Sequence, residues 1–273
     1  MSIKLDILNK YAKSFSEIQP FNCNTLTYVG IAFQFDSIVN FDENQSVFYS
    51  KVKEKYPYKN ETQTSEGSLM LTISPEKNEF GFNQQSENFT EYIYTDNKDD
   101  PTIRFVVNRR KIDIQCINPQ KNYDQFKNFL GKTMSILDVF CEVYNENLNL
   151  MSVVLRKINK INLDKEGIYL DTHLFYEQNM IQNYSNVTSY KEFLTRGSNN
   201  ETIELRSGVI KNQSDNNEPF LIYDFLLRQD NPNLLKLDNK EELRSMLEEF
   251  SRKIYNLYCY CVGEKYIEKV LKQ

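Results

Sequence analysis

Two segments carry the longest helical patterns of the chain, one near its middle and one near its end. Asn118 can cap the first helix and Pro119 suits its first turn, while Asp238 and Glu241 can cap the second. Apolar residues at helical spacing follow both starts: Tyr123, Phe126, Phe129, Leu130, Ile136, Leu137, Phe140, Cys141 and Tyr144, then Leu243, Met246, Leu247, Phe250, Ile254 and Leu257. These patterns predict two long amphipathic helices, and Gly263 is expected to break the second.

Elsewhere the hydrophobic period changes to two residues, as in strands with one buried face. This period assigns strands to residues 27–35, 69–74, 79–83, 103–107, 111–117, 148–163, 203–211 and 220–227. Residues 84–101 are predicted either as a loop or as one more strand over 89–94. A bend or bulge is expected near Lys157, so alternation leaves open which face of the sheet Arg156 and Asn159 use.

Shorter helices are predicted at residues 3–18, 43–56 and 190–196. The helix over residues 3–18 is predicted from apolar residues at helical spacing. The second ends before Pro57, because the residue that precedes a proline avoids the helical conformation. The third has Ser189 and Glu192 as a capping box and Gly197 as a terminator.

The order of these elements predicts an α+β fold with antiparallel sheets and long amphipathic helices packed on one face. The expected division is an N-terminal helix in residues 1–20, followed by two strand-rich halves. The first half, 21–146, is closed by the central helix, and the second, 147–273, by the C-terminal helix. The halves share this rhythm, so we predict that they are similar, with one compact domain as the alternative.

The charge balance of the chain limits the kinds of partner that it is expected to bind. The 273 residues include 33 Lys and Arg against 38 Asp and Glu, a formal net charge of −5. This balance does not favour nucleic acid as a partner, because phosphate contacts require a basic surface. The sequence contains no apolar run long enough to span a bilayer, and its charged start does not resemble a signal peptide. We therefore expect a cytoplasmic protein with no membrane partner.

Residues suited to catalysis or metal binding are scarce. The chain has 1 His, His173, and no nucleophile is visibly paired with it, so we interpret it as a polar residue at a strand end. Cys259 and Cys261 would diverge by about 200° on a helix and are interpreted as packing residues. Common phosphate-binding and hydrolase motifs do not occur in the sequence. We expect no catalytic residue, metal or cofactor, and these features weigh against an enzyme.

The least ordinary polar residues are Arg156 and Asn159, which lie in an otherwise apolar strand. A buried arginine needs an acidic or carbonyl partner, and Asp224 in a later strand is the candidate. One interpretation is a structural pair of Arg156 and Asp224. The other is a ligand-binding set of Arg156, Asn159 and Asp224 that holds a phosphate or a carboxylate.

Residues 155–161 read LRKINKI, which resembles the L-R-Y-I-N-R-I type strand of a sporadically distributed, uncharacterised bacterial protein family. The strand with Phe33, the helix ending at Tyr56, the strand with Asp224 and the C-terminal helix follow in the order of that family. The resemblance covers about residues 25–270. The chain lacks the Trp usual near the start of the central helix and the His usual in the last helix. The family has no established activity, and its patchy distribution implies accessory roles in defence or toxin neutralisation.

Three functions are compatible with these features. The preferred hypothesis is a non-enzymatic binding protein, for instance an accessory, antitoxin or immunity component of a bacterial defence or toxin system. It is motivated by abundant Tyr and Phe, which suit the centres of interfaces. The alternatives are a small-ligand sensor or enzyme with a pocket at Arg156, Asn159 and Asp224, and a chaperone-like oligomer. We expect a protein partner, and self-association is a further expectation.

Overall fold

A computed structural model describes residues 5–18, 21, 25–74, 79–117, 119, 123, 125–144, 148–170, 189–196, 200–211, 218–230 and 239–272. The strands are β1 (Leu26–Phe35), β2 (Tyr58–Ser74), β3 (Glu79–Thr95), β4 (Ile103–Asn108), β5 (Lys111–Cys116), β6 (Leu150–Asn162), β7 (Ser189–Arg196), β8 (Glu201–Lys211) and β9 (Pro219–Asp230). The helices are η1 (Leu5–Asn9), α1 (Phe41–Val52), α3 (Phe126–Val143), α4 (Leu163–Glu166), α6 (Lys240–Val262) and α7 (Glu264–Tyr266), with short turns η2 (Phe15–Glu17), η3 (Gly167–Tyr169) and η5 (Ile267–Leu271). The predicted α+β class is confirmed.

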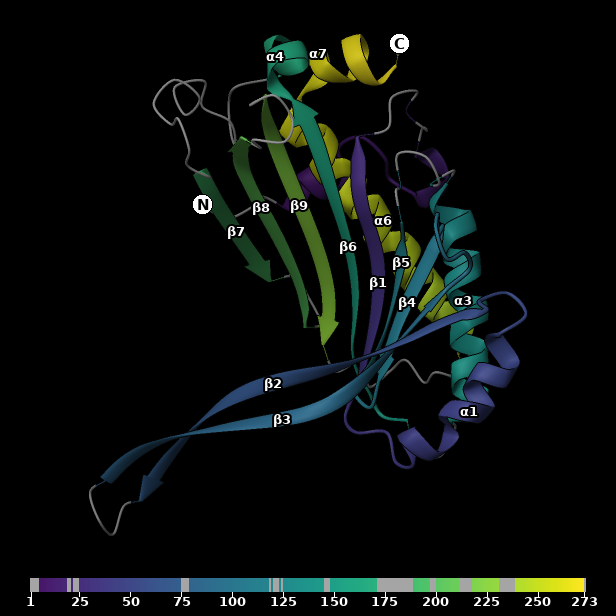
Figure 1. Cartoon of the computed structure of the whole chain (residues 1–273). Coiled ribbons are helices and arrows are strands. Elements are labelled where there is room, and N and C mark those ends of the chain that lie inside the picture. Colours follow the sequence, from purple (N-terminus) through teal and green to yellow (C-terminus); the bar gives the residue numbers. More distant parts are fainter. Residues whose placement is uncertain are drawn as a thin grey trace.

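The described strands form one antiparallel sheet of nine strands in the order β2-β3-β4-β5-β1-β6-β9-β8-β7 (Figure 1). β1 and β6 pair at its centre, so the earlier strands lie on one side and the later strands on the other. The register of this pair is irregular only near its two ends, between Leu26 and Tyr28 and between Gln34 and Phe35. A register irregularity does lie beside Lys157, but the extra residue is in the partner strand: the shift between Leu26 and Tyr28 of β1 is opposite Asn159 and Ile158. β6 itself is not interrupted there, because its buried and partly exposed residues alternate from Val153 to Asn162.

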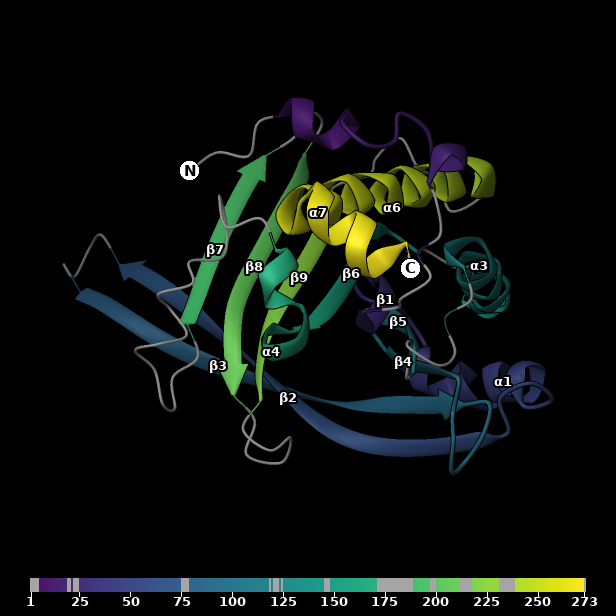
Figure 2. The same cartoon turned by 90° about the horizontal axis from the view of Figure 1, so that it is seen from above.

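The hairpin predicted near residues 69–83 is much longer in the structure. β2 and β3 each span 17 residues and pair from Tyr58 opposite Thr95 to Ser74 opposite Glu79. The strand predicted over 89–94 is therefore part of β3, and the predicted turn at 75–78 lies outside the described residues. The two strands extend beyond the sheet as an arm that passes the ends of β6 and β9 on the side away from α6 (Figures 1 and 2).

α3 and α6, of 18 and 23 residues, lie on one face of the sheet, and Figure 2 shows α6 running across β6 and β9. The side chain of Asn239 accepts a hydrogen bond from the Glu242 amide and caps α6. The predicted caps Asn118 and Asp238 lie outside the described residues. Gly263 ends α6 with a φ of 80°, which confirms the predicted break. Within the described residues, no helix is long and apolar enough to cross a membrane.

Aromatic side chains fill much of the space between sheet and helices. Phe48, Phe105 and Phe140 are fully buried, and ring centroids in this cluster lie 5.9 to 6.2 Å apart in edge-to-face contacts. The buried amide of Gln45 donates to the Tyr144 hydroxyl and accepts from that of Tyr94, at 2.7 and 2.8 Å. The hydroxyls of Tyr94 and Tyr144 therefore have hydrogen-bond partners inside the core.

The N-terminal segment does not form the single helix predicted over residues 3–18. Instead it contains η1 and η2, with irregular backbone between them. The Asn256 side chain accepts from the amide of Ala12 and donates to the Ala12 carbonyl, at 3.0 and 2.9 Å. Arg252 donates to the carbonyls of Leu8 and Ala12. These side chains of α6 satisfy backbone groups that a continuous helix would have paired internally.

The helix predicted over residues 190–196 was also wrong. This segment is strand β7, which pairs along its whole length with β8, from Ser189 opposite Val209 to Arg196 opposite Thr202. A helix of two turns is marginal in water, whereas the edge of β8 offers a complete ladder of hydrogen bonds. The proposed terminator Gly197 lies outside the described residues.

Candidate functional site

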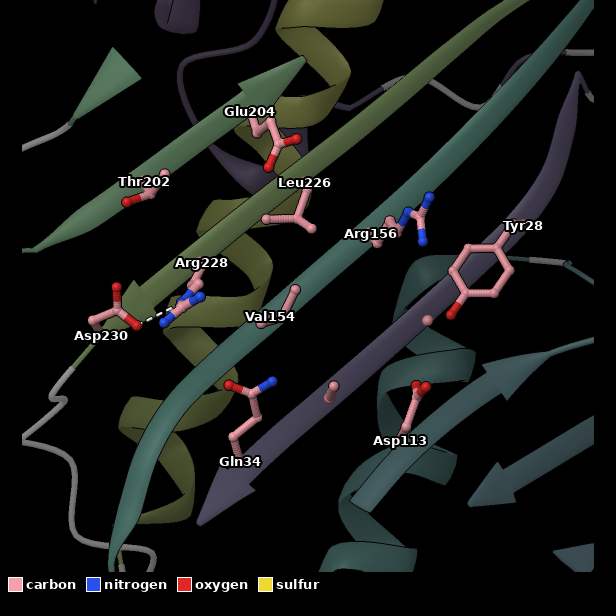
Figure 3. A pocket seen from close by; sticks show the side chains of 12 residues that line it. Tyr28, Gln34, Asp113, Val154, Arg156, Thr202, Glu204, Leu226, Arg228 and Asp230 are labelled. Atoms are coloured by element: carbon pink, nitrogen blue, oxygen red, sulfur yellow. Dashed lines mark hydrogen bonds and ion pairs between the residues drawn. The ribbon is translucent and has the colours of Figure 1, made fainter. Parts of the chain in front are cut away.

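A hollow of about 460 Å³ lies on the outer face, which is the face of the sheet away from α6. Its lining comes from strands on both sides of the β1–β6 pair and includes Tyr28, Asp113, Arg156, Glu204 and Arg228. Figure 3 shows these side chains on the near side of the strands, with α6 behind them. The hollow is therefore built on the central strands of the sheet, from β5 across β1, β6 and β9 to β8.

Arg156 and Asp224 form the ion pair that the sequence suggested. Nε and Nη2 of Arg156 donate to the two oxygens of Asp224 at 2.9 and 2.7 Å, a two-pronged geometry. These hydrogen bonds raise the pKa of the arginine above its ordinary value. The Arg156 side chain is 39% exposed and that of Asp224 12%, so the guanidinium is oriented by the pair yet reachable from solvent.

Tyr28 covers one flank of this arginine. The guanidinium carbon lies 5.6 Å from the centre of the tyrosine ring, within the range of a cation–π contact. The ring lies over Gly30, where an added Cβ would come within 2.5 Å of the tyrosine hydroxyl. Burial raises the pKa of Tyr28. The glycine thus lets an aromatic ring lie along β1 beside Arg156.

Further charged groups surround the hollow. Nε of Arg228 donates to Asp230 at 2.5 Å, and Arg206 pairs with Glu204 on β8. Asp113 on β5 accepts from the Gln115 side chain, and burial raises the pKa of its carboxyl. Positive and negative groups alternate across the outer face, which favours a partner whose charges also alternate over one with a single sign.

Asn159 does not join this site. Since side chains alternate along β6, Asn159 faces the helices, where it accepts from the Thr25 hydroxyl at 3.0 Å. The structure therefore brings together Arg156 and Asp224 and separates Asn159 from them. The predicted pocket of all three residues is not formed, because the irregularity beside Lys157 is in β1, while β6 alternates regularly and keeps Asn159 on the face opposite Arg156.

Sequence reasoning missed several residues around the hollow, notably Tyr28 and Arg228. The signal that would have found them is strand pairing: Gly30 lies opposite Arg156 in β1, and Leu226 lies opposite it in β9. Residues two positions away on those strands share the face of Arg156. Pairing of distant strands cannot be read from one sequence, so these neighbours become evident only in the folded chain.

The histidine, the possible metal ligands and the cysteines are the other candidates for catalysis or metal binding. His173 lies outside the described residues. Among the residues that are described, no group of three His, Cys, Asp or Glu is placed to hold a metal ion. Burial raises the pKa of the Cys116 thiol to about 11 and that of Cys259 to about 12. These two thiols are therefore protonated at neutral pH and are poor nucleophiles.

No family model and no curated protein sequence matches the chain. The resemblance to the sporadically distributed bacterial family therefore stays a prediction.

We expect Arg156→Ala to lower the free energy of unfolding by about 1 to 2 kcal/mol, because it leaves the largely buried Asp224 without its partner. Urea denaturation checks this value. Arg228→Ala is the matched control, since the Arg228–Asp230 pair is more exposed and should contribute less than about 0.5 kcal/mol. Equal losses for the two variants would contradict the assignment of Arg156 to a fixed position.

Proposed function

We propose that the protein is a non-enzymatic binding protein that docks a partner protein on the outer face of its sheet. The observation that carries this proposal is the preoriented Arg156, held by Asp224 and flanked by Tyr28. Arg and Tyr are frequent among the residues that dominate binding energy at interfaces. An arginine fixed before binding also loses less conformational entropy when a partner contacts it.

The test is native pull-down of a stoichiometric partner with tagged wild-type protein, Arg156→Glu and Arg228→Glu. Both substitutions reverse a charge on the outer face and should abolish retention of the partner. Lys269→Ala is the control, since Lys269 is exposed on η5. A clean monomer without a partner would sink the proposal, as would a partner that all variants retain equally.

We further propose an accessory, antitoxin or immunity role for this binding, which is the role that the family resemblance implies. The two similar halves are likewise proposed, with β1 and β6 as corresponding strands. The sheet order supports this, because each half begins with a central strand and returns a later strand to pair beside it. A small-ligand sensor and a chaperone-like oligomer stay predictions.

A further inference from the structure

A second hollow, here called the helix-side pocket, lies on the opposite face of the same sheet. Its volume is about 550 Å³, within the range of roughly 300–1,000 Å³ typical of small-molecule sites. The N-terminal segment, the start of α3, the middle of α6 and strand β6 supply its lining. Aromatic rings form much of that lining, among them Phe15, Phe21, Phe126 and Tyr255.

Lys157 is the unusual residue of the helix-side pocket. It is the neighbour of Arg156 in β6, but alternation directs it to the helix side, where it is 9% exposed. Nζ donates to the Ser251 hydroxyl at 2.9 Å and lies 4.6 Å from the centre of the Phe126 ring. Within the described residues, its contacts include no carboxylate. A buried ammonium without a counter-charge is costly, so proteins rarely keep one for packing alone.

The remaining charged and titratable groups of the pocket do not balance this amine. Glu248 and Lys127 contribute one charge of each sign to the lining, and Lys127 is exposed. Tyr123, Tyr255 and Tyr258 present phenol groups. Burial lowers the pKa of Lys157 to about 7, so near neutral pH the amine can take up a proton when an anion arrives.

Neutral polar groups stand next to the amine on the same wall. Asn159 follows two positions later on β6, and the Thr25 hydroxyl lies 3.0 Å from its Oδ1 and 2.8 Å from the Tyr258 hydroxyl. A ligand oxygen held by Lys157 would thus have hydroxyl and amide groups within the same pocket. Beyond them the rings and Ile254 offer apolar surface to the remainder of the ligand.

We propose that the helix-side pocket binds a small monocarboxylic acid with an apolar or aromatic body, and that Lys157 pairs with its carboxylate. A singly charged group matches the single buried cation of the described lining, whereas a doubly charged phosphate would remain half neutralised. The rings then enclose the body of the acid. This inference concerns the face opposite the proposed docking surface and does not depend on a partner protein.

The experiment is isothermal titration of the full chain with octanoate and 4-phenylbutyrate, each compared with its uncharged amide. Wild-type protein should bind one of the acids at least tenfold more tightly than the matching amide at pH 6. That affinity should fall about tenfold at pH 8, because the free amine must then take up a proton. The variants Lys157→Met and Arg156→Met remove neighbouring cations from opposite faces of the sheet.

Lys157→Met should abolish the preference for the acid, while Arg156→Met should leave it unchanged. Lys157→Gln, which retains a polar head, provides a second variant should methionine perturb folding. The inference is overturned if acid and amide bind wild-type protein equally, if neither binds, or if Lys157→Met keeps the preference. Loss of the preference in Arg156→Met would also overturn it, because the acid would then not depend on the pocket of Lys157.

Discussion

Replacing Lys157 with methionine is expected to raise the free energy of unfolding by about 2 kcal/mol at pH 6. The side chain is 9% exposed and its ammonium lies among aromatic rings, so the folded state loses hydration that the unfolded state retains. Methionine has a similar length and adapts readily to an irregular apolar site. A substitution that stabilises the fold would indicate that the lysine is kept for binding.

The pH dependence of this gain follows from the two pKa values of Lys157. Its pKa is about 7 in the folded state, because of burial, against 10.5 for an ordinary lysine. Between these values the unfolded chain binds more protons, so the stability of the wild-type protein rises with pH. The gap corresponds to at most about 5 kcal/mol. The advantage of Lys157→Met should therefore be full below pH 7, and it should be lost or reversed by pH 10.

Urea denaturation of both proteins at pH 6, 8 and 10 measures this trend. Arg156→Met is the control, because an arginine keeps its charge throughout this range and the difference from wild type should stay constant. The prediction is contradicted if Lys157→Met destabilises the protein at pH 6, or if its effect does not change with pH. The Lys157 amine would then be in contact with solvent or paired with a carboxylate of the protein.

The second large effect is expected for Arg252→Ala, which should lower the free energy of unfolding by about 3 kcal/mol. Nη1 of Arg252 donates to the carbonyls of Leu8 and Ala12 at 2.7 and 2.8 Å, and its side chain is 5% exposed. Truncation leaves the Leu8 carbonyl without this donor and the Ala12 carbonyl with Asn256 alone. The N-terminal segment would then be held to α6 mainly by Asn256 and should separate from it more often, which takes Phe15 away from the helix-side pocket.

Unfolding measurements and trypsin cleavage after Lys10 and Lys13 detect both consequences. Glu249→Ala is the matched control: it removes the carboxylate partner of Arg252 but spares the contacts to the N-terminal segment. Since Arg252 keeps its hydrogen bonds to both carbonyls in this variant, the control should lose less stability than Arg252→Ala and should not increase cleavage. Similar stability losses and similar cleavage rates in the two variants would contradict this account of how the segment is held.

Local patterns predicted the elements whose own residues determine them. The long helices and the hairpin of β4 and β5 satisfy their hydrogen bonds within short stretches of chain, so the spacing of their apolar residues identifies them. The errors came where distant residues supply the partners. Arg252 and Asn256 replace the internal hydrogen bonds of an N-terminal helix. Residues 189–196 form a strand because they pair with β8.

In the candidate site too, local patterns predicted some features and missed others. An arginine in an apolar strand and an aspartate in a later one were enough to predict the Arg156–Asp224 pair. The sequence did not mark Lys157 as buried, because a lysine normally keeps its ammonium in solvent and alternation left its face open. Only unbroken alternation along β6, together with the helices over one face, distinguishes the buried lysine from the reachable arginine beside it.

β6 directs two consecutive cations into different environments, with the amine of Lys157 enclosed on the helix side. A carbon-13 NMR titration of the lysine Cε signals tests this most directly, with Lys157→Met to assign the resonance. One lysine signal should titrate near pH 7 and disappear in the variant. A wild-type spectrum in which every lysine titrates above pH 10 would contradict it.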